Sequence, residues 1–298
     1  MAQTTKRLAV CILNWNGLEQ TKQCVTALLE STYKNFDIII LDNGSVNNEA
    51  KPLEQTFVNN ITTYRSEENL GFAGGYNYLI LDLLKNNVYT YYLLLNQDAL
   101  VTPNCIEQLI KHLENNPNTA VVGPKVLAPD NTIQSLGADI NLVTGKITSR
   151  FQEQDICRDA LQCVSTNPEP VDVVIGNCFM VRANTIQQLG LFDTNYFAYY
   201  EEADWCLRAK QANLTCAVVP QAVIFHHKIG KFRTYLIVRN MIWFEKKFAS
   251  PIQLVQFFWY FWFVFFFERL KKGSRFSELL IASIDGWFGL NKGQAKFL

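Results

Sequence analysis

Short apolar runs alternate with segments of helical spacing along the first hundred residues. The segments 7–13 (RLAVCIL), 36–45 (FDIIILDNGS) and 89–96 (YTYYLLLN) are apolar and rich in strand-forming residues, so each predicts a strand. Between them, 17–32 and 74–87 carry apolar residues at helical spacing and predict helices. Strands that alternate with helices predict an α/β fold, in which helices cover both faces of a parallel sheet.

The pattern becomes less regular beyond residue 103. It predicts a helix at 104–115, a strand near 119–122, a loop-rich stretch from Pro124 to Pro170, a strand and a helix within 171–190, a turn and a helix within 191–214, and two strands separated by a proline within 215–227. No internal repeat or low-complexity linker interrupts the chain. The simplest division is one compact domain over 1–230 and a C-terminal helical region over 231–298.

Polar residues gather where three predicted strands end, at 14–17 (NWNG), 42–45 (DNGS) and 96–98 (NQD). Ligands of such sheets bind outside the carboxyl ends of the strands, so we expect a site there. Asp98 is an acid that can hold a divalent cation together with phosphate oxygens. The alternative is that Asp98 caps the segment that follows it.

Three further motifs carry candidate chemistry. The segment 69–77 (NLGFAGGYN) leads glycines into a helix, where backbone amides attract phosphate, although a flexible turn is the alternative. If a helix begins at Glu201, then Glu201 and Asp204 share one stripe and Glu202 points elsewhere. Their apolar neighbours favour a general base, and a solvated first turn is the alternative. His226, which closes an apolar strand, is a candidate for metal or phosphate contact.

The ordered set of motifs is more specific than any member. Over residues 7 to about 245 the chain resembles the inverting family 2 glycosyltransferases, specifically the rhamnosyltransferase-like branch. The motifs that carry the resemblance are CILNWNG, LDNGS, NLGFAGGYN, LLLNQD, GPKV, GNCFMVRANTIQQLGLFD, YYEEADWCLR and VIFHH. This family implies the glycosyltransferase A fold, a Rossmann-like mixed and mostly parallel sheet flanked by helices, here followed by a helical, aromatic-rich appendage.

The resemblance also implies roles for individual residues. The nucleotide-sugar site would comprise Asn14, Asn16, Asp42, Asn43, Gly71, Phe72, Gly75, Asn77 and Asn96. Asp98 corresponds to the last acid of the family's D-x-D motif, and His226 to the histidine that completes the metal and diphosphate site. Glu202 corresponds to the general base. Asn96 replaces one acid of the D-x-D motif, which implies weak metal affinity. Glu202 stands where Asp is usual, which leaves Glu201 or Asp204 as the alternative base.

The implied activity is an inverting, metal-dependent transfer of a hexosyl-type sugar, with rhamnose among the candidates. The donor would be a dTDP-, UDP- or GDP-sugar, the cofactor Mg²⁺ or Mn²⁺, and the acceptor a glycan or lipid-linked hydroxyl in cell-surface polysaccharide synthesis. A catalytically weak or silent nucleotide-sugar-binding protein is the alternative, because of Asn96 and Glu202. An oxidoreductase is disfavoured because no G-x-G-x-x-G follows the first strand.

The segment 252–272 has ten aromatic residues. Its uninterrupted part, 257–267, spans only about 16 Å as a helix, so it is too short to cross a bilayer. We expect an interfacial helix, with a packing or dimer helix and a tilted span as alternatives. Residues 1–227 carry a net charge of −8, whereas 228–275 carry +8, which favours an anionic surface as partner. Nucleic acid is not expected, because the aromatics are too contiguous and apolar for a stacking groove.

The cysteines and the N-terminal segment indicate in which cellular compartment the protein works. The eight cysteines are scattered without a C-x-x-C pair, which predicts small buried side chains in a reducing cytosol. The N-terminal segment has only a brief apolar run, unlike a signal peptide. We therefore expect a cytoplasmic protein at the inner face of the cell membrane, in peripheral contact with it. A homodimer is left open.

Overall fold

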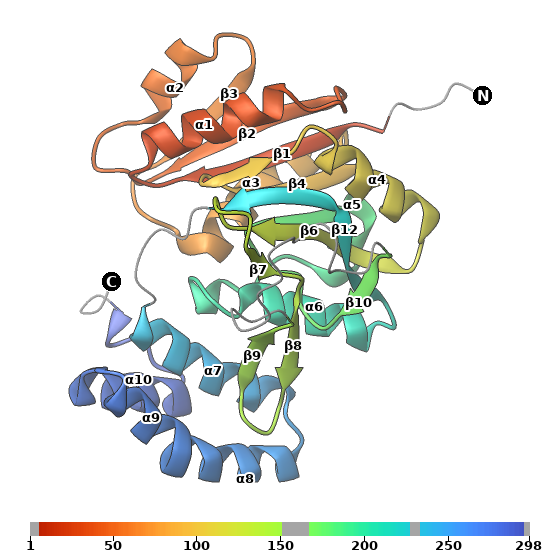
Figure 1. Ribbon diagram of the computed structural model, residues 1–298. Coiled ribbons are helices and arrows are strands. Elements are labelled where there is room, and N and C mark those ends of the chain that lie inside the picture. The colour runs from red at the N-terminus through yellow and green to blue at the C-terminus, as the bar shows by residue number, and fades with distance from the viewer. Residues whose placement is uncertain (1–5, 151–166, 227–232, 295–298) are drawn as a thin grey trace.

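A mixed sheet flanked by helices forms the body of the protein (Figure 1). The computed structural model describes residues 6–150, 167–226 and 233–294. The main sheet has the order β10-β12-β6-β11-β4-β1-β2-β3, with β5 paired to β12 and β7 to β6, and β8 and β9 form a separate hairpin. The strands are β1 (Leu8–Asn14), β2 (Phe36–Asn43), β3 (Ile61–Ser66), β4 (Tyr91–Asn96), β5 (Ala99–Val101), β6 (Thr119–Leu127), β7 (Ile133–Ser135), β8 (Ala138–Asn141), β9 (Lys146–Ser149), β10 (Glu169–Val171), β11 (Cys178–Arg182) and β12 (Thr215–His226).

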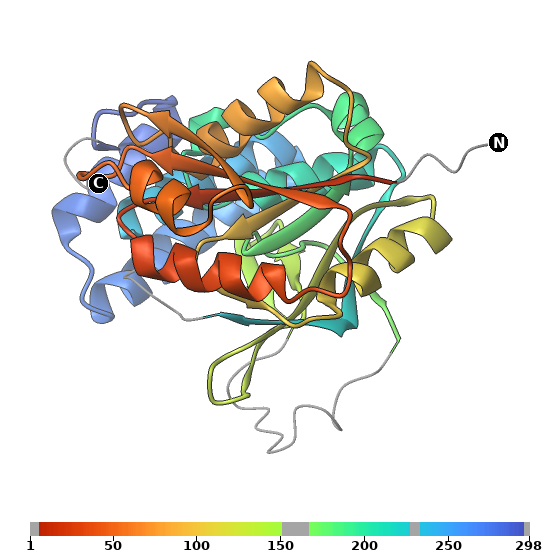
Figure 2. The ribbon, with the colours of Figure 1, turned by 90° about the horizontal axis from the view of Figure 1, so that it is seen from above.

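The helices cover both faces of the sheet. The α-helices are α1 (Leu18–Leu29), α2 (Ala50–Thr56), α3 (Gly71–Leu84), α4 (Cys105–Asn115), α5 (Ala183–Leu189), α6 (Glu201–Gln211), α7 (Thr234–Phe248), α8 (Pro251–Tyr260), α9 (Phe266–Lys271) and α10 (Phe276–Phe288). Buried side chains of α1, α2 and α4 form the core on one face, and those of α3, α6 and α7 form the core on the other. Figure 2 shows α1 and α4 on one side of the sheet and α3 on the opposite side. This burial explains why the strands are nearly all apolar.

The sheet is mixed because only part of it follows the alternating strand–helix pattern. Strands β1, β2, β3 and β4 pair in parallel, as does β12 with β6. In contrast, β11 runs antiparallel to β4 and β6, and β5 and β10 run antiparallel to β12. The predicted mixed, mostly parallel sheet of the glycosyltransferase A type is therefore confirmed at the level of topology.

Three expectations about element boundaries were wrong. Helix α3 begins at Gly71, three residues before the expected start. The stretch beyond Pro124 is less loop-rich than expected, because β6 continues to Leu127 and β7, β8 and β9 follow. The expected strand pair around Pro220 is one strand, β12. A register shift between Val219 and Val223 accommodates the proline, which has no amide hydrogen for a regular ladder.

The C-terminal helices extend the core rather than standing apart from it. Buried residues of α7, α8 and α10 belong to the same apolar cluster as those of α3 and α6. The expected domain boundary at residue 230 falls outside the described residues. In Figure 1, α8, α9 and α10 lie at the end of the molecule opposite β2 and β3. Within the described residues, no helix is both long and apolar enough to cross a membrane.

Free, buried cysteines are found throughout the described part of the chain, at Cys11, Cys24, Cys105, Cys178, Cys206 and Cys216. Burial raises the pKa of the Cys11 thiol, which keeps it protonated and unreactive. These six behave as the small buried side chains that the sequence predicts. Cys157 and Cys163 lie outside the described residues.

Candidate active site

The strand ends that carry polar residues meet at one edge of the sheet. In the parallel register Asn14 lies opposite Asp42, and Leu13 opposite Asn96. The loops that follow β1, β2 and β4 therefore open onto a common region, as expected for the ligand edge of such a sheet.

Asp42 organises the loop after β2. Its side chain is fully buried, and its Oδ1 accepts a hydrogen bond from the Ser45 amide at 3.1 Å. Its Oδ2 accepts from the Glu49 amide at 3.0 Å and from Arg65 Nη1 at 2.5 Å. The β2–β3 register places Arg65 directly beside Asp42. Sequence reasoning missed Arg65, because only the strand pairing brings these two residues together.

Asn14 and Asn16 connect the loop after β1 to the loop after β2. Asn14 is fully buried, accepts a hydrogen bond from Thr21 Oγ1 at 2.7 Å and donates to Glu49 Oε2 at 2.8 Å. Asn16 accepts from the Val46 amide at 3.0 Å. These contacts make the two asparagines supports of the ligand edge. Direct contact with a nucleotide stays a prediction for both.

The glycine-rich segment packs against the loop before α6. Gly71 has a φ of 73°, and a Cβ there would lie 2.4 Å from the Phe197 carbonyl oxygen. The Phe72 amide donates to that same carbonyl at 2.7 Å. Asn43 donates to the Gly71 carbonyl at 3.1 Å and accepts from the Leu70 amide at 3.0 Å. Only glycine fits this crossing of two loops.

Gly75 and Asn77 fix α3 in place. A Cβ on Gly75 would lie 2.9 Å from a methyl carbon of Leu13, so helix and sheet approach closely here. Asn77 is buried and holds both backbone groups of Phe192, donating to its carbonyl at 2.8 Å and accepting from its amide at 3.1 Å. These two predicted nucleotide-site residues therefore position the elements around the site.

Asp98 and His226 lie side by side. Asp98 Oδ1 is 3.3 Å from His226 Nε2, and both side chains are mostly buried. The pairing of β5 with β12 sets His226 opposite Ala99, so the antiparallel ladder brings the two together. Gln134 donates to the His226 carbonyl at 2.8 Å, and its Oε1 is 3.3 Å from Nδ1 of the ring. Sequence reasoning missed Gln134, which lay in the expected loop.

This pair offers two ligands to a divalent cation. A carboxylate oxygen and an imidazole nitrogen converge, and Gln134 orients the ring through its other nitrogen. Among the described residues no three His, Cys, Asp or Glu side chains form a metal cluster. A cation here would therefore rely on substrate oxygens and water, as Mg²⁺ commonly does. Of Asn96, the structure shows a backbone hydrogen bond, from its amide to the Asn177 carbonyl at 3.0 Å.

The acids of α6 are in different environments. Asp204 is fully buried between two cations, with Arg208 Nε at 2.8 Å and Lys247 Nζ at 2.5 Å. Glu201 is buried as well, and Glu202 is partly buried. Each glutamate has an Oε2 that finds no hydrogen-bond partner among the described residues. Asp204 therefore forms ion pairs with Arg208 and Lys247. Glu201 and Glu202 each have one carboxylate oxygen that could accept a hydrogen bond from a substrate.

Burial and mutual proximity set the protonation of the two glutamates. Burial, followed by the charge of Glu202, raises the pKa of Glu201 well above its usual range. Burial also raises the pKa of Glu202, and a backbone hydrogen bond, followed by the neighbouring Glu201 side chain, opposes that rise. The two therefore behave as a pair in which Glu201 keeps a proton more readily than Glu202.

The loop that presents the two glutamates has an unusual backbone. Phe197, Tyr199 and Tyr200 have φ values of 64°, 69° and 75°, a conformation that non-glycine residues rarely adopt. Two fully buried residues of α7 hold this loop. Arg239 donates to the Tyr196 carbonyl at 3.0 Å, and Asn240 donates to the carbonyls of Tyr196, Ala198 and Tyr199 at 2.9, 2.8 and 2.8 Å.

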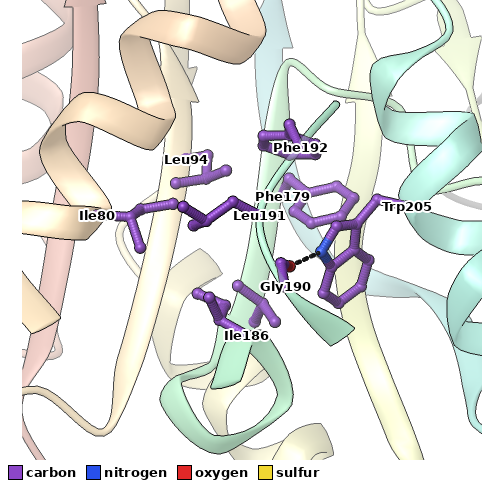
Figure 3. A pocket seen from close by; sticks show the side chains of 9 residues that line it. Ile80, Leu94, Phe179, Ile186, Gly190, Leu191, Phe192 and Trp205 are labelled. Atoms are coloured by element: carbon purple, nitrogen blue, oxygen red, sulfur yellow. Dashed lines mark hydrogen bonds between the residues drawn. The ribbon is translucent and has the colours of Figure 1, made fainter. Parts of the chain in front are cut away.

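A small apolar cavity lies between α3, β4, β11 and α6 (Figure 3). Its volume is about 10 Å³, too small for a sugar or a nucleotide. Trp205 of α6 lines it and donates from Nε1 to the Gly190 carbonyl at 2.9 Å. Phe192, which Asn77 holds, lines it as well. The cavity belongs to the packing that supports α6, and the ligand edge lies elsewhere.

The mixed, mostly parallel sheet is the fold expected of a glycosyltransferase. The family model described as glycosyl transferase family 2 matches residues 9–184, more than half of the chain, and the chain belongs to this family. This membership confirms the predicted family.

Curated relatives point to the same branch. The chain is 24% identical over 237 residues to the N-acetylglucosaminyl-diphospho-decaprenol L-rhamnosyltransferase of Mycobacterium tuberculosis (strain H37Rv), covering 75% of this chain and 77% of the relative. It is 26% identical over 245 residues to the low-salt glycan biosynthesis hexosyltransferase Agl10 of Haloferax volcanii, covering 78% and 73%. The rhamnosyltransferase-like character is thereby confirmed.

Solved structures confirm the glycosyltransferase A fold. A crystal structure of GalNAc-T7 with UDP, GalNAc and Mn²⁺ aligns with a TM-score of 0.67 at 14% identity, covering 83% of this chain. The chain spans about half of that protein, 48% of its length. Staphylococcus aureus TarS, residues 1–349, aligns with a TM-score of 0.59 at 13% identity, covering 94% of this chain and 80% of TarS.

Proposed function

We propose that this glycosyltransferase is inverting and metal-dependent, and that it transfers a hexosyl-type sugar from a nucleotide donor. The observation that carries the proposal is the separation of two chemical groups on different elements. Asp98 and His226 converge between β4 and β12, and Glu201 and Glu202 begin α6. A single displacement needs two such groups, one for the leaving diphosphate and one for the attacking hydroxyl.

Asp98 and His226 form the diphosphate side of the site. Mg²⁺ or Mn²⁺ held by these two residues would offset the negative charge that develops on the leaving diphosphate. Gln134 keeps the His226 ring oriented through its hydrogen bonds. Asp42 and Asn43 keep the loops of the ligand edge in shape for the nucleoside. A relative of the same fold was solved with UDP and Mn²⁺, which supports the choice of ligands.

Glu202 takes the proton in this proposal. The acceptor oxygen forms a bond to the anomeric carbon while the bond from that carbon to the diphosphate oxygen breaks. The diphosphate leaves with the bonding electrons, and the hydroxyl proton moves to a Glu202 carboxylate oxygen. Glu201 holds its own proton more firmly, because burial and the charge of Glu202 raise its pKa well above the usual range. Asp204 is a poor base because its carboxylate already forms ion pairs with Arg208 and Lys247.

The acceptor in this proposal is a lipid-linked glycan of cell-surface polysaccharide synthesis, and rhamnose is the first candidate sugar. The name of the Mycobacterium tuberculosis relative states a rhamnosyl transfer to a decaprenol-linked diphosphate sugar, which supports both choices. Such an acceptor brings the enzyme into peripheral contact with the inner face of the cell membrane. The exposed aromatic residues of α8 support that contact. A homodimer stays a prediction.

A donor panel tests the proposal. The purified chain is incubated with UDP-, dTDP- and GDP-sugars and a short lipid-linked acceptor, with Mg²⁺, with Mn²⁺ or with a chelator. We expect one nucleotide class to support transfer, inversion of the anomeric centre by NMR, and loss of transfer with the chelator and in Asp98→Asn. Retention of configuration would contradict the inverting mechanism.

The alternative function is a silent nucleotide-sugar-binding protein. Asn96 and Glu202, which depart from the family pattern, favour it. In that case calorimetry would detect donor binding, and no donor of the panel would be transferred or hydrolysed.

A further inference from the structure

The outward face of α8 and α9 is apolar and exposed. The two helices are joined by a π-helical turn, Phe261–Phe265, so the chain from Pro251 to Lys271 is helical throughout. Along it, large apolar side chains are open to solvent at a spacing of three or four residues. They are Ile252 (74% exposed), Val255 (59%), Trp259 (57%), Phe263 (63%) and Phe267 (55%). We call these five residues the outer stripe.

The opposite side of the same helices is also apolar. Phe257, Phe261, Phe265 and Phe266 are buried and belong to the core shared with α7 and α10. A helix that is apolar on all sides is normally surrounded by protein or by lipid. The core buries one side of these helices, whereas no described residue buries the outer stripe. Such a continuous exposed patch marks an interaction surface.

Helix α10 adds to this surface. Phe276, Ile284 and Phe288 are exposed, at 59%, 43% and 74%. In Figure 1, α8, α9 and α10 lie together at one end of the molecule. The described ring contacts confirm this proximity, since Phe266 of α9 lies 5.8 Å from Phe276, measured between ring centroids.

Basic residues lie at the end of the outer stripe. Lys271 ends α9, Lys272 and Arg275 lie between α9 and α10, and all three are exposed. The neighbouring acid, Glu268, is 3.6 Å from Lys146, measured from Oε2 to Nζ, and is therefore already paired. The surface thus combines apolar side chains with unbalanced positive charge. An anionic lipid surface matches both features, because acyl chains accept aromatic side chains and headgroups attract lysine and arginine.

We propose that the outer stripe, with the basic turn at 271–275, docks this enzyme on the surface of an anionic bilayer. This proposal deepens the membrane contact of the proposed function and rests on it. The aromatic residues enter the boundary between headgroups and acyl chains, and the basic turn lies among the headgroups. A second copy of the chain would match the apolar side chains but not the positive charge.

Vesicle flotation tests the proposal with the full chain. The probes are vesicles of phosphatidylcholine alone and of phosphatidylcholine mixed with phosphatidylglycerol. We expect binding to the mixed vesicles, and a loss of about tenfold or more in Trp259→Ser/Phe263→Ser, because binding scales with the apolar area inserted. In Lys271→Gln/Lys272→Gln, binding to the mixed vesicles should fall roughly fivefold for each lysine removed and become less dependent on salt.

Val58→Ser/Leu81→Ser is the matched control, since these side chains are 62% and 53% exposed and lie far from α8 in the chain. It should float like the natural chain. Equal flotation of the outer-stripe variant and the control would overturn the proposal. So would a lipid-free dimer that the outer-stripe variant converts to monomer while neither form binds vesicles.

Transfer to a short, soluble acceptor separates this proposal from the proposed function. The outer-stripe variant should keep that activity, because none of its changes touches the catalytic site. Vesicle binding by a chain that transfers no sugar would contradict the proposed function and leave the docking surface standing.

Discussion

The two halves of the candidate site are built in opposite ways. On the diphosphate side, regular strand pairing places Asp98 beside His226, and buried hydrogen bonds satisfy Asp42 and Asn14. On the side of α6, the backbone before Glu201 is strained and buried carboxylate oxygens lack partners in the described chain. The first half has the polar groups that we propose to bind the donor and its metal. The second keeps groups of altered proton affinity, which is typical of positions that carry out chemistry.

The loop before Glu201 depends on α7, which the sequence analysis placed in a separate C-terminal region. Arg239 and Asn240 of α7 hold the loop before α6. Arg239 also donates to Asn291 at 2.7 Å and to Gln294 at 2.6 Å. The C-terminal helices are thus connected by hydrogen bonds to the backbone that presents Glu201. Four changes test this comparison.

Glu202→Gln should have the largest effect. Without a base, kcat should fall by about 10²–10⁴-fold, while donor affinity measured by calorimetry stays nearly unchanged. Glu201→Gln should keep most of the activity, because the raised pKa of Glu201 keeps it protonated and glutamine is a neutral replacement of the same size. If Glu202→Gln turns over at a near-normal rate and Glu201→Gln does not, the roles of the two residues are exchanged.

Asn240→Ala should come next. It removes the Asn240 donor from the carbonyls of Ala198 and Tyr199, whereas the Tyr196 carbonyl still accepts from Arg239. We therefore expect a loss of roughly 3 kcal/mol in the free energy of unfolding. Urea denaturation measures this loss. Where the variant is folded, kcat should fall more than donor affinity. Asn115→Ala, at an exposed position of α4, is the control for a general asparagine effect.

Glu245→Gln should stabilise the protein. Glu245 of α7 is fully buried, both of its oxygens lack partners in the described chain, and burial raises its pKa to about 8. Because the folded pKa lies above the ordinary value of 4.5, the stability that the protonated form provides is present below pH 4.5 and is lost as the pH rises towards 8. Glutamine avoids this loss, so we expect a gain of about 3 kcal/mol at neutral pH.

The pH dependence checks the cause of that gain. Thermal unfolding of the natural chain and Glu245→Gln, followed from acid to alkaline pH, should show similar stability near pH 4.5 and a growing advantage of the variant above it. An advantage that is the same at every pH would assign the gain to packing.

Gln134→Ala should have the smallest effect. It removes the hydrogen bonds that orient His226, so we expect about tenfold weaker apparent affinity for Mg²⁺ or Mn²⁺ in the transfer assay. Its kcat at saturating metal should stay close to normal. An unchanged metal dependence would place His226 outside the metal site.

The sequence alone located much of this arrangement because local patterns encode it. Apolar runs with helical segments between them predicted β1, β2, β4, α1 and α4, and the polar ends of those strands marked the ligand edge. The order of the motifs identified the family, which the comparisons confirm. The sequence also predicted a turn and a helix within 191–214, where α6 begins at Glu201.

The tertiary structure decided which of these residues act together. Arg65 meets Asp42 only through the pairing of β3 with β2, and His226 meets Asp98 only through the pairing of β5 with β12. Asp204 looked equivalent to its neighbours in the sequence, but Lys247 of α7 reaches it from 43 residues away and makes it part of an ion pair. Local spacing determines elements and their exposed ends. Contacts between residues far apart in the chain determine which carboxylate forms an ion pair and which stays without a partner among the described residues.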